Sequence, residues 1–162
     1  MFDSFRTIAE VSVTLAGFVG IIAVLRRRDE GFSRFGLVQL LQTTFAALFF
    51  AFLPDLLSNV FSWDTTWRAS AGAFGLYHGF AIVNHRIRQR GLRKTTWLQI
   101  AITIASIPVV VLKLLVGLGF LMQHAYAIYY LGLLWLLGIA VFLFGMLLFD
   151  PADLPEGDPE AL

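Results

Sequence analysis

Residues 97–122 read WLQIAITIASIPVVVLKLLVGLGFLM, an apolar run whose single charged residue is Lys113. A helix needs about 20 mostly apolar residues to cross ~30 Å of hydrocarbon at ~1.5 Å per residue. The run therefore predicts a transmembrane helix. Four further apolar stretches lie on either side of it, at residues 5–25, 37–61, 67–84 and 126–149. The stretch at 67–84 is the shortest and most polar of the five, and it contains His78.

The composition of the whole chain agrees with a membrane protein. Of its 162 residues 58% are hydrophobic and 14% are charged, with a mean hydropathy of +0.76. Soluble domains are about 45–50% apolar and about 25% charged. Sixteen Phe and four Trp suit both the bilayer core and its interface. The absence of cysteine excludes disulfides and thiolate metal sites.

The placement of basic residues predicts how the chain is threaded through the membrane. If all five stretches cross, two connecting segments with nine basic residues share one side, and the other side holds only Arg6 and Arg68. Basic residues concentrate on the cytoplasmic side of membrane proteins. We therefore expect an all-α integral membrane protein, a bundle of about five transmembrane helices with the N-terminus outside and the C-terminus cytoplasmic. A bacterial inner (plasma) membrane is the expected location.

The same basic segments are also candidates for contact with anionic lipids, at about 1 kcal/mol per residue. The candidates are Arg26, Arg27, Arg28, Arg86, Arg88, Arg90, Arg93 and Lys94. Residues 1–149 are expected to form one transmembrane domain. Residues 150–162, with five acidic residues and three prolines, are expected to be a disordered acidic cytoplasmic tail.

Four ionisable residues fall inside the predicted spans: Glu10, Asp55, His78 and Lys113. A Lys or Asp at the centre of a bilayer costs about 2.5–3.5 kcal/mol, and such residues usually face protein or water. Counted along their helices, Glu10, Asp55 and Lys113 reach a similar level in the outer half of the membrane, and His78 lies near its centre. We expect a buried charge cluster, which either orients the helices or forms part of a transport path.

A polar stripe runs along the predicted helix at 97–122. Its members are spaced by three, four or seven residues, which places them on one helix face: Gln99, Thr103, Ser106, Lys113, Gly117 and His124. Such a stripe faces a bundle interior or a water-filled path. Small residues at Ala71, Gly75 and Gly79 predict close helix packing. The helix at 126–149 has no strongly polar side chain after Tyr130, and we expect it to face lipid or a partner.

The sequence indicates two classes of function. The first is a small homo-oligomeric channel or transport protein that moves ions or protons along a polar path built from Glu10, Asp55, His78, Lys113 and the stripe residues Gln99, Thr103 and Ser106. The alternative is a non-catalytic accessory or assembly subunit of a larger membrane complex, docked through helix 126–149 and the acidic tail. No hydrolase motif, haem-ligand pair or metal-ligand spacing is present, so we expect neither an enzyme nor a cofactor or metal, and no nucleic-acid partner.

Overall fold

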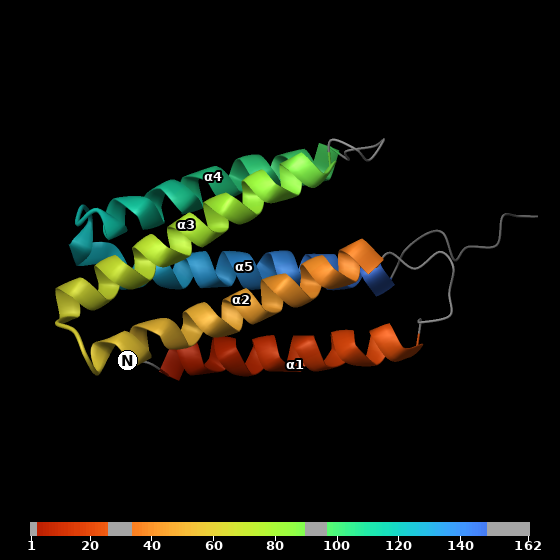
Figure 1. Cartoon of the computed structure of the whole chain (residues 1–162), viewed down its shortest axis with the longest axis horizontal. Coiled ribbons are helices and arrows are strands. Elements are labelled where there is room, and N and C mark those ends of the chain that lie inside the picture. Colours follow the sequence, from red (N-terminus) through yellow and green to blue (C-terminus); the bar gives the residue numbers. More distant parts are fainter. Residues whose placement is uncertain (1–2, 26–33, 90–96, 149–162) are drawn as a thin grey trace, which may run out of the picture.

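The computed structural model describes residues 3–25, 34–89 and 97–148, and within these ranges the chain is helical apart from two short connections (Figure 1). A short 3₁₀ turn, η1 (Met122–His124), precedes the last helix. The long helices are α1 (Asp3–Leu25), α2 (Arg34–Ser58), α3 (Trp63–Gln89), α4 (Trp97–Gly117) and α5 (Ala125–Leu148). The predicted all-helical class is confirmed.

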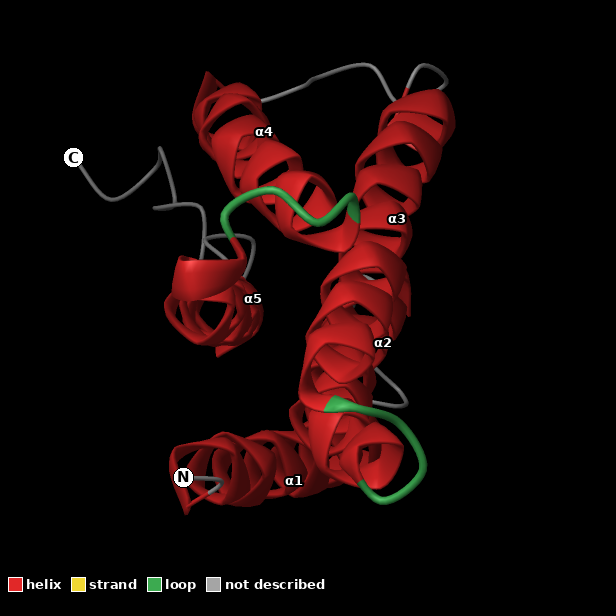
Figure 2. Ribbon diagram, turned by 90° about the vertical axis from the view of Figure 1, so that its left-hand side faces the viewer, coloured by secondary structure: helices red, strands yellow, loops and turns green. Residues whose placement is uncertain are grey.

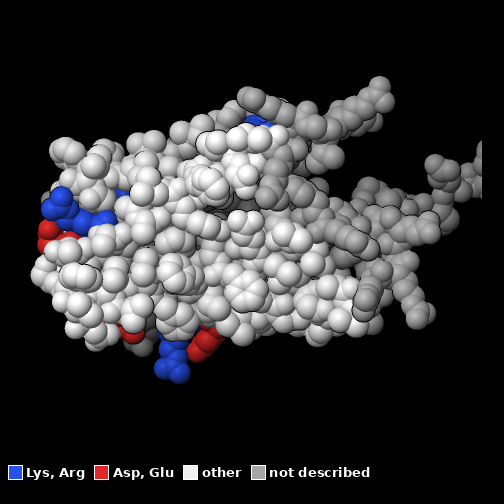
Figure 3. Space-filling model, in the orientation of Figure 1, with Lys and Arg blue, Asp and Glu red and all other residues white. Residues whose placement is uncertain are grey.

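Four of these helices are long and apolar enough to cross a membrane: α1, α2, α4 and α5. Their large apolar side chains also remain exposed, and Phe18, Phe49 and Ile104 are each more than half accessible. The face shown in Figure 3 is almost free of charge, with charged side chains gathered at one end and along one edge. Water-soluble monomers rarely expose apolar surface on this scale. These features indicate a multi-pass membrane protein.

Helix α5 occupies the middle of the bundle. Helices α1 to α4 form an arc, and α5 lies on its concave side, in contact with each of the other four (Figure 2). One side of α5 stays exposed, at Leu131, Leu134 and Val141, as expected of a helix that faces lipid or a partner. Its packing against all four other helices was not expected. Neighbouring helices and lipid are both apolar surroundings, so the uniform apolarity of α5 could not distinguish the centre of the bundle from its edge.

One end of the bundle collects aromatic residues. Because neighbouring helices in the chain are antiparallel, α1, α3 and α5 begin at this end, and α2 and α4 finish there (Figure 1). We call it the aromatic end, after Phe5, Trp63, Trp67, Tyr126, Tyr129 and Tyr130. Trp and Tyr side chains are typical of the interface between membrane and water.

Helix α4 stops at Gly117, five residues before the end of the predicted span. Gly119 adopts a left-handed φ of 92°. The Phe120 N–H donates to the Leu115 carbonyl and the Gly119 N–H to the Val116 carbonyl, each at 2.9 Å. This pair of bonds is the Schellman motif that ends many helices, and it favours glycine at the left-handed position.

Helices α3 and α4 touch at the aromatic end and diverge toward the opposite end (Figure 2). At the contact, a Cβ on Gly117 would lie 2.7 Å from the Gly72 Cα, so the two backbones lie against each other. Gly75 packs on Leu114, and Gly79 faces α4 farther along. The small residues of α3 thus pack within one chain, and the spreading of the two helices leaves room for side chains at the other end.

Candidate functional site

A lysine lies completely buried in the middle of the bundle. Lys113 on α4 has no exposed surface, and its Nζ lies 2.8 Å from Nδ1 of His78 on α3. The same Nζ lies 3.4 Å from the centre of the Phe74 ring, on its face. His78 is itself only 3% exposed. A hydrogen bond and a cation–π contact therefore hold the amine, and both partners come from α3.

Helix α5 supplies the space for this arrangement at Gly132. A Cβ at Gly132 would lie 3.0 Å from the Lys113 Cδ and 3.2 Å from the Phe74 Cε1. The lysine stem and the Phe74 ring thus lie directly against the α5 backbone. Three helices build the site, and any side chain at position 132 would have to displace the lysine or the ring.

The Lys113–His78 hydrogen bond limits the charge that the pair can hold. A lysine ammonium has only donors, so it bonds Nδ1 only when that nitrogen carries no proton. A protonated Nδ1 would in turn need a neutral amine as its acceptor. While the bond lasts, the two nitrogens therefore share one proton. Among the residues that the structure describes, Lys113 forms no ion pair with a carboxylate.

A polar crevice leads from the end opposite the aromatic end to His78. It consists of two adjoining cavities, of about 90 and 130 Å³, between α2, α3, α4 and α5. Both cavities are lined by Gln39, Thr43, His78, Ala81, His85 and Leu136. Liquid water takes ~30 Å³ per molecule, so the two cavities have room for several waters. Their walls are mixed, because apolar side chains such as Ile102, Ile139 and Leu143 lie beside the polar groups.

Further polar groups line the two cavities separately. Gln42 and Asn84 line the smaller one, and Thr103 and Ser106 line the larger one. The Ser106 hydroxyl donates to the Ile102 carbonyl at 2.8 Å and accepts from Trp135 Nε1 at 2.9 Å. Amides, hydroxyls and imidazoles from three helices thus provide hydrogen-bonding groups along the crevice up to the buried pair.

On the other side of Lys113, rings fill the bundle. Phe50 and Phe74 stack with their centres 4.5 Å apart, and Tyr129 packs on Phe74 at 5.4 Å. Trp67 and Phe5 continue the packing, each within 6 Å of Tyr129. We call these five residues the aromatic cluster. All five are at most 4% exposed, so the cluster forms a closely packed plug between the buried pair and the aromatic end.

A proline explains why a tyrosine belongs to the aromatic cluster. Pro54 interrupts the hydrogen bonding of α2, because it has no N–H to donate to the carbonyl of Phe50, four residues earlier. The Tyr129 hydroxyl donates to this carbonyl instead, at 2.6 Å. A buried carbonyl without a donor costs about 1–3 kcal/mol. The bond therefore fixes α5 to α2 at the position that the proline leaves unsatisfied.

The structure brings together two of the four ionisable residues that the sequence singles out. His78 and Lys113 meet, whereas Glu10 and Asp55 lie exposed on the outside of α1 and α2. Glu10 pairs with Arg6 on its own helix, at 3.3 Å. Depth along a helix can be counted from sequence, but the face that carries a residue depends on how the helices pack. Counted along their helices, Glu10 and Asp55 lie at a depth similar to that of Lys113, but their side chains point away from it.

The polar stripe of α4 is distributed over several environments. Ser106 and Lys113 are buried, Thr103 lines the crevice, and Gly117 contacts α3. His124 lies beyond the helix end and is exposed. The side chain of Gln99 lies outside the described part of the chain.

Most of the basic residues predicted to meet anionic lipid also lie outside the described ranges. Arg86 is described, as a half-buried residue near the end of α3. The tail at 150–162 is outside the described ranges too, as are Arg26, Arg27, Arg28, Arg90, Arg93, Lys94 and the side chain of Arg88.

Sequence reasoning placed the polar face of the second helix, with Gln39, Gln42 and Thr43, along the expected path, and these residues line the crevice. It missed Phe74 and Gly132 as parts of the site. Gly132 lies three residues after Tyr129 on the same helix face, but Gly138 and Gly145 occur in the same helix, so the sequence does not single it out. Phe74 is one of 16 phenylalanines, and nothing in the sequence separates it from the rest.

Compared with protein-family models, curated proteins and solved structures, the chain matches none of them. Its activity is therefore inferred from the chemistry of the Lys113–His78 pair and of the polar crevice.

Proposed function

We propose that the chain is a small transport protein that moves protons or ions through the polar crevice, with the Lys113–His78 pair as the binding step inside the membrane. The observation that carries the proposal is a buried amine and imidazole at the closed end of a polar crevice. Ionisable groups inside a membrane are costly and usually mark ion or proton pathways. A pair that served only to orient helices would not need a polar approach.

The proposal includes five membrane spans, with α3 as the fifth. Helix α3 has 27 residues, about 40 Å at ~1.5 Å per residue, and lies between α2 and α4 along their length (Figure 1). Its low apolarity reflects charged residues near its two ends, such as Asp64, Arg68 and Arg86, together with the bundle-facing Ser70 and His78. The aromatic end then faces outward and the crevice opens to the cytoplasm of a plasma membrane, where the basic segments contact anionic headgroups.

Among small species, a proton suits the site best. A positive charge that has no carboxylate beside it repels metal cations, whereas a proton can pass between the two hydrogen-bonded nitrogens. Water in the crevice would deliver the proton to His78, and His78 would exchange it with Lys113. The aromatic cluster closes the other side, so passage through the membrane requires a second conformation in which the rings of Phe50, Phe74 and Tyr129 separate.

Proton flux into liposomes tests the proposal. The purified chain is reconstituted with a pH-sensitive dye inside the vesicles, and a potassium diffusion potential drives proton entry. Wild type is expected to acidify the vesicles at a rate at least several times that of protein-free liposomes. Lys113→Met and His78→Gln are expected to lose this flux, because each removes one nitrogen of the relay.

His124→Gln is the matched control, since it makes the same change at an exposed histidine outside the crevice. It is expected to retain the flux of wild type. If wild type moves neither protons nor small anions faster than empty liposomes do, the transport proposal is contradicted. Flux that Lys113→Met and His78→Gln leave intact would contradict the assignment of this site.

A further inference from the structure

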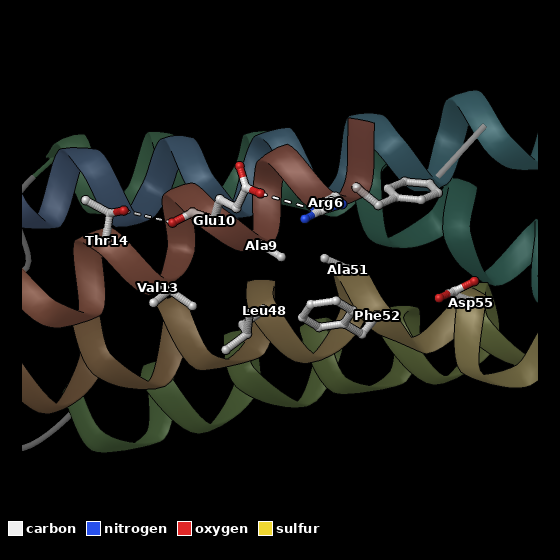
Figure 4. Close-up of a pocket in the computed structure, with 10 residues that line it drawn as sticks. Arg6, Ala9, Glu10, Val13, Thr14, Leu48, Ala51, Phe52 and Asp55 are labelled. Atoms are coloured by element: carbon white, nitrogen blue, oxygen red, sulfur yellow. Dashed lines mark hydrogen bonds and ion pairs between the residues drawn. The ribbon is translucent and has the colours of Figure 1, made fainter. Parts of the chain in front are cut away.

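A second feature of the molecule lies outside the transport site, on the surface formed by α1 and α2. The two helices border a groove of about 780 Å³ whose floor is formed where Ala9 and Ala51 face each other (Figure 4). Val13, Leu48 and Phe52 form apolar walls. We call this the α1–α2 groove. It faces away from the crevice, where the surroundings of a membrane protein are lipid.

Three charged residues border this apolar groove. Arg6 and Glu10 lie on the α1 side and Asp55 on the α2 side (Figure 4). The side chains of Arg6 and Glu10 are 78% and 66% exposed, and Asp55 is exposed as well. Arg6 and Glu10 pair with each other, whereas Asp55 has no ion-pair partner among the described residues.

Counted along the candidate spans, these charges fall within the expected depth of the hydrocarbon. Glu10 is four residues, about 6 Å, from residue 14, the centre of the span Ser4–Val24. Asp55 is eight residues, about 12 Å, from residue 47, the centre of Gly36–Ser58. The hydrocarbon extends about 15 Å to each side of its centre. Charges that face lipid at such depths are unfavourable and call for a protein partner.

Arg6 lies at the same level as Asp55. It too is eight residues from the centre of its span, toward the same end of the bundle. Two identical chains in a membrane share one orientation, so a two-fold axis along the helices brings residues of equal depth together. Such an interface must be self-complementary, and a groove with an arginine and an unpaired aspartate at one level meets that condition.

We infer that the α1–α2 groove docks a second copy of this chain, with Arg6 of each copy against Asp55 of the other. Val13 and Leu48 then pack across the two-fold axis, and Arg6 gains a second carboxylate partner beside Glu10. The interface leaves the polar crevice untouched, so each copy holds its own Lys113–His78 pair. The inference is independent of whether the crevice carries protons.

Disulfide crosslinking tests the inference, because the chain has no cysteine of its own. Val13→Cys places a thiol in the groove, and Val11→Cys places one on the opposite face of α1 at a similar depth. Both positions are exposed, at 55% and 39%. On oxidation of native membranes, Val13→Cys is expected to give a band at twice 18.1 kDa, and Val11→Cys none.

Charge reversal in the Val13→Cys chain then tests the ion pair. Arg6→Glu and Asp55→Arg are each expected to lower the crosslink yield at least fivefold, and the two together to restore it. If neither charge reversal changes the crosslink yield, the pairing of Arg6 with Asp55 of the other copy is overturned.

The comparison of Val13→Cys with Val11→Cys decides the question even if the reversed chains fail to fold. Equal yields at the two positions, or a Val13→Cys chain that stays at 18.1 kDa, would overturn the inference and leave lipid as the occupant of the groove. A Val13→Cys crosslink to a different protein would overturn it in favour of a heterologous partner.

Discussion

The two ends of this bundle differ in what fills the space between the same helices. At the aromatic end, α3 and α4 meet through Gly72 and Gly117, and stacked rings fill the interior. At the opposite end, α3 and α4 diverge, and amides, hydroxyls and imidazoles line a crevice (Figure 2). The buried Lys113–His78 pair lies at the boundary between the two.

The difference shows how the packing of two helices can open space for polar side chains inside a bundle of apolar helices. Small residues at one end of a helix pair draw the backbones together, and the divergence that follows opens space for polar groups at the other end. Tight packing at the aromatic end thus produces the crevice. The aromatic end should therefore control stability, and the crevice should control function.

The largest effect is expected where the backbones of α3 and α4 touch. The Cβ of Gly117→Ala would meet the Gly72 Cα at 2.7 Å, which no side-chain movement relieves. Overpacking costs about 1–3 kcal/mol, and we expect about 3 kcal/mol here because backbone must shift. Gly138→Ala is the control, since its Cβ meets nothing within 4 Å and should stabilise the helix slightly. Thermal unfolding in detergent compares them, and equal melting temperatures would contradict the close contact.

The next effect separates the two members of the buried pair. His78→Leu leaves the Lys113 amine buried without its hydrogen bond, and we expect a loss of about 2 kcal/mol. Lys113→Met instead removes the buried charge and keeps the volume, so its melting temperature should equal or exceed that of wild type. Thermal unfolding of both variants measures the difference. A Lys113→Met chain that is less stable than His78→Leu would show that the pair serves chiefly to hold the fold.

A smaller effect concerns the bond from Tyr129 to the carbonyl that Pro54 leaves free. Tyr129→Phe leaves the Phe50 carbonyl without a donor and is expected to cost about 1 kcal/mol. Adding Pro54→Ala supplies a backbone N–H for that carbonyl, so most of the loss should be recovered in the double variant. The unfolding free energies of wild type, Tyr129→Phe, Pro54→Ala and the double variant form a double-mutant cycle. Additive losses would mean that the two residues act separately.

Four of the five long helices could be predicted because apolar length alone decides them, whereas the span at 67–84 was predicted from the placement of basic residues. Four stretches recur as long apolar helices, and α3 forms at the predicted place but extends beyond 67–84 at both ends. The end of α4 was missed because the Schellman motif at Gly119 depends on local backbone geometry within an unbroken apolar run. The packing of α5 against all four other helices was not predicted, because lipid and protein interior select the same side chains.

The site could be predicted in part. Burial cost singled out His78 and Lys113 correctly as groups to examine, and the stripe placed Thr103 and Ser106 toward the interior. The same reasoning wrongly assigned Glu10 and Asp55 to the cluster. Counting residues along a helix gives the depth of a side chain, but it does not show whether that side chain points into the bundle. Phe74 and Gly132 contribute through their shape. Which helix they pack against cannot be read from a single sequence.

The central claim is that water reaches the Lys113–His78 pair from one side only. Three alanines of α3 test it in the cysteine-free chain: Ala81 lines the crevice, Ala73 faces outward and Ala71 is buried at the aromatic end. Each is replaced by cysteine, and a charged, membrane-impermeant thiol reagent is applied to reconstituted vesicles from either side. We predict that Ala81→Cys alone reacts, and only from the side of the basic segments. An Ala81→Cys as unreactive as Ala71→Cys would contradict a water-filled crevice.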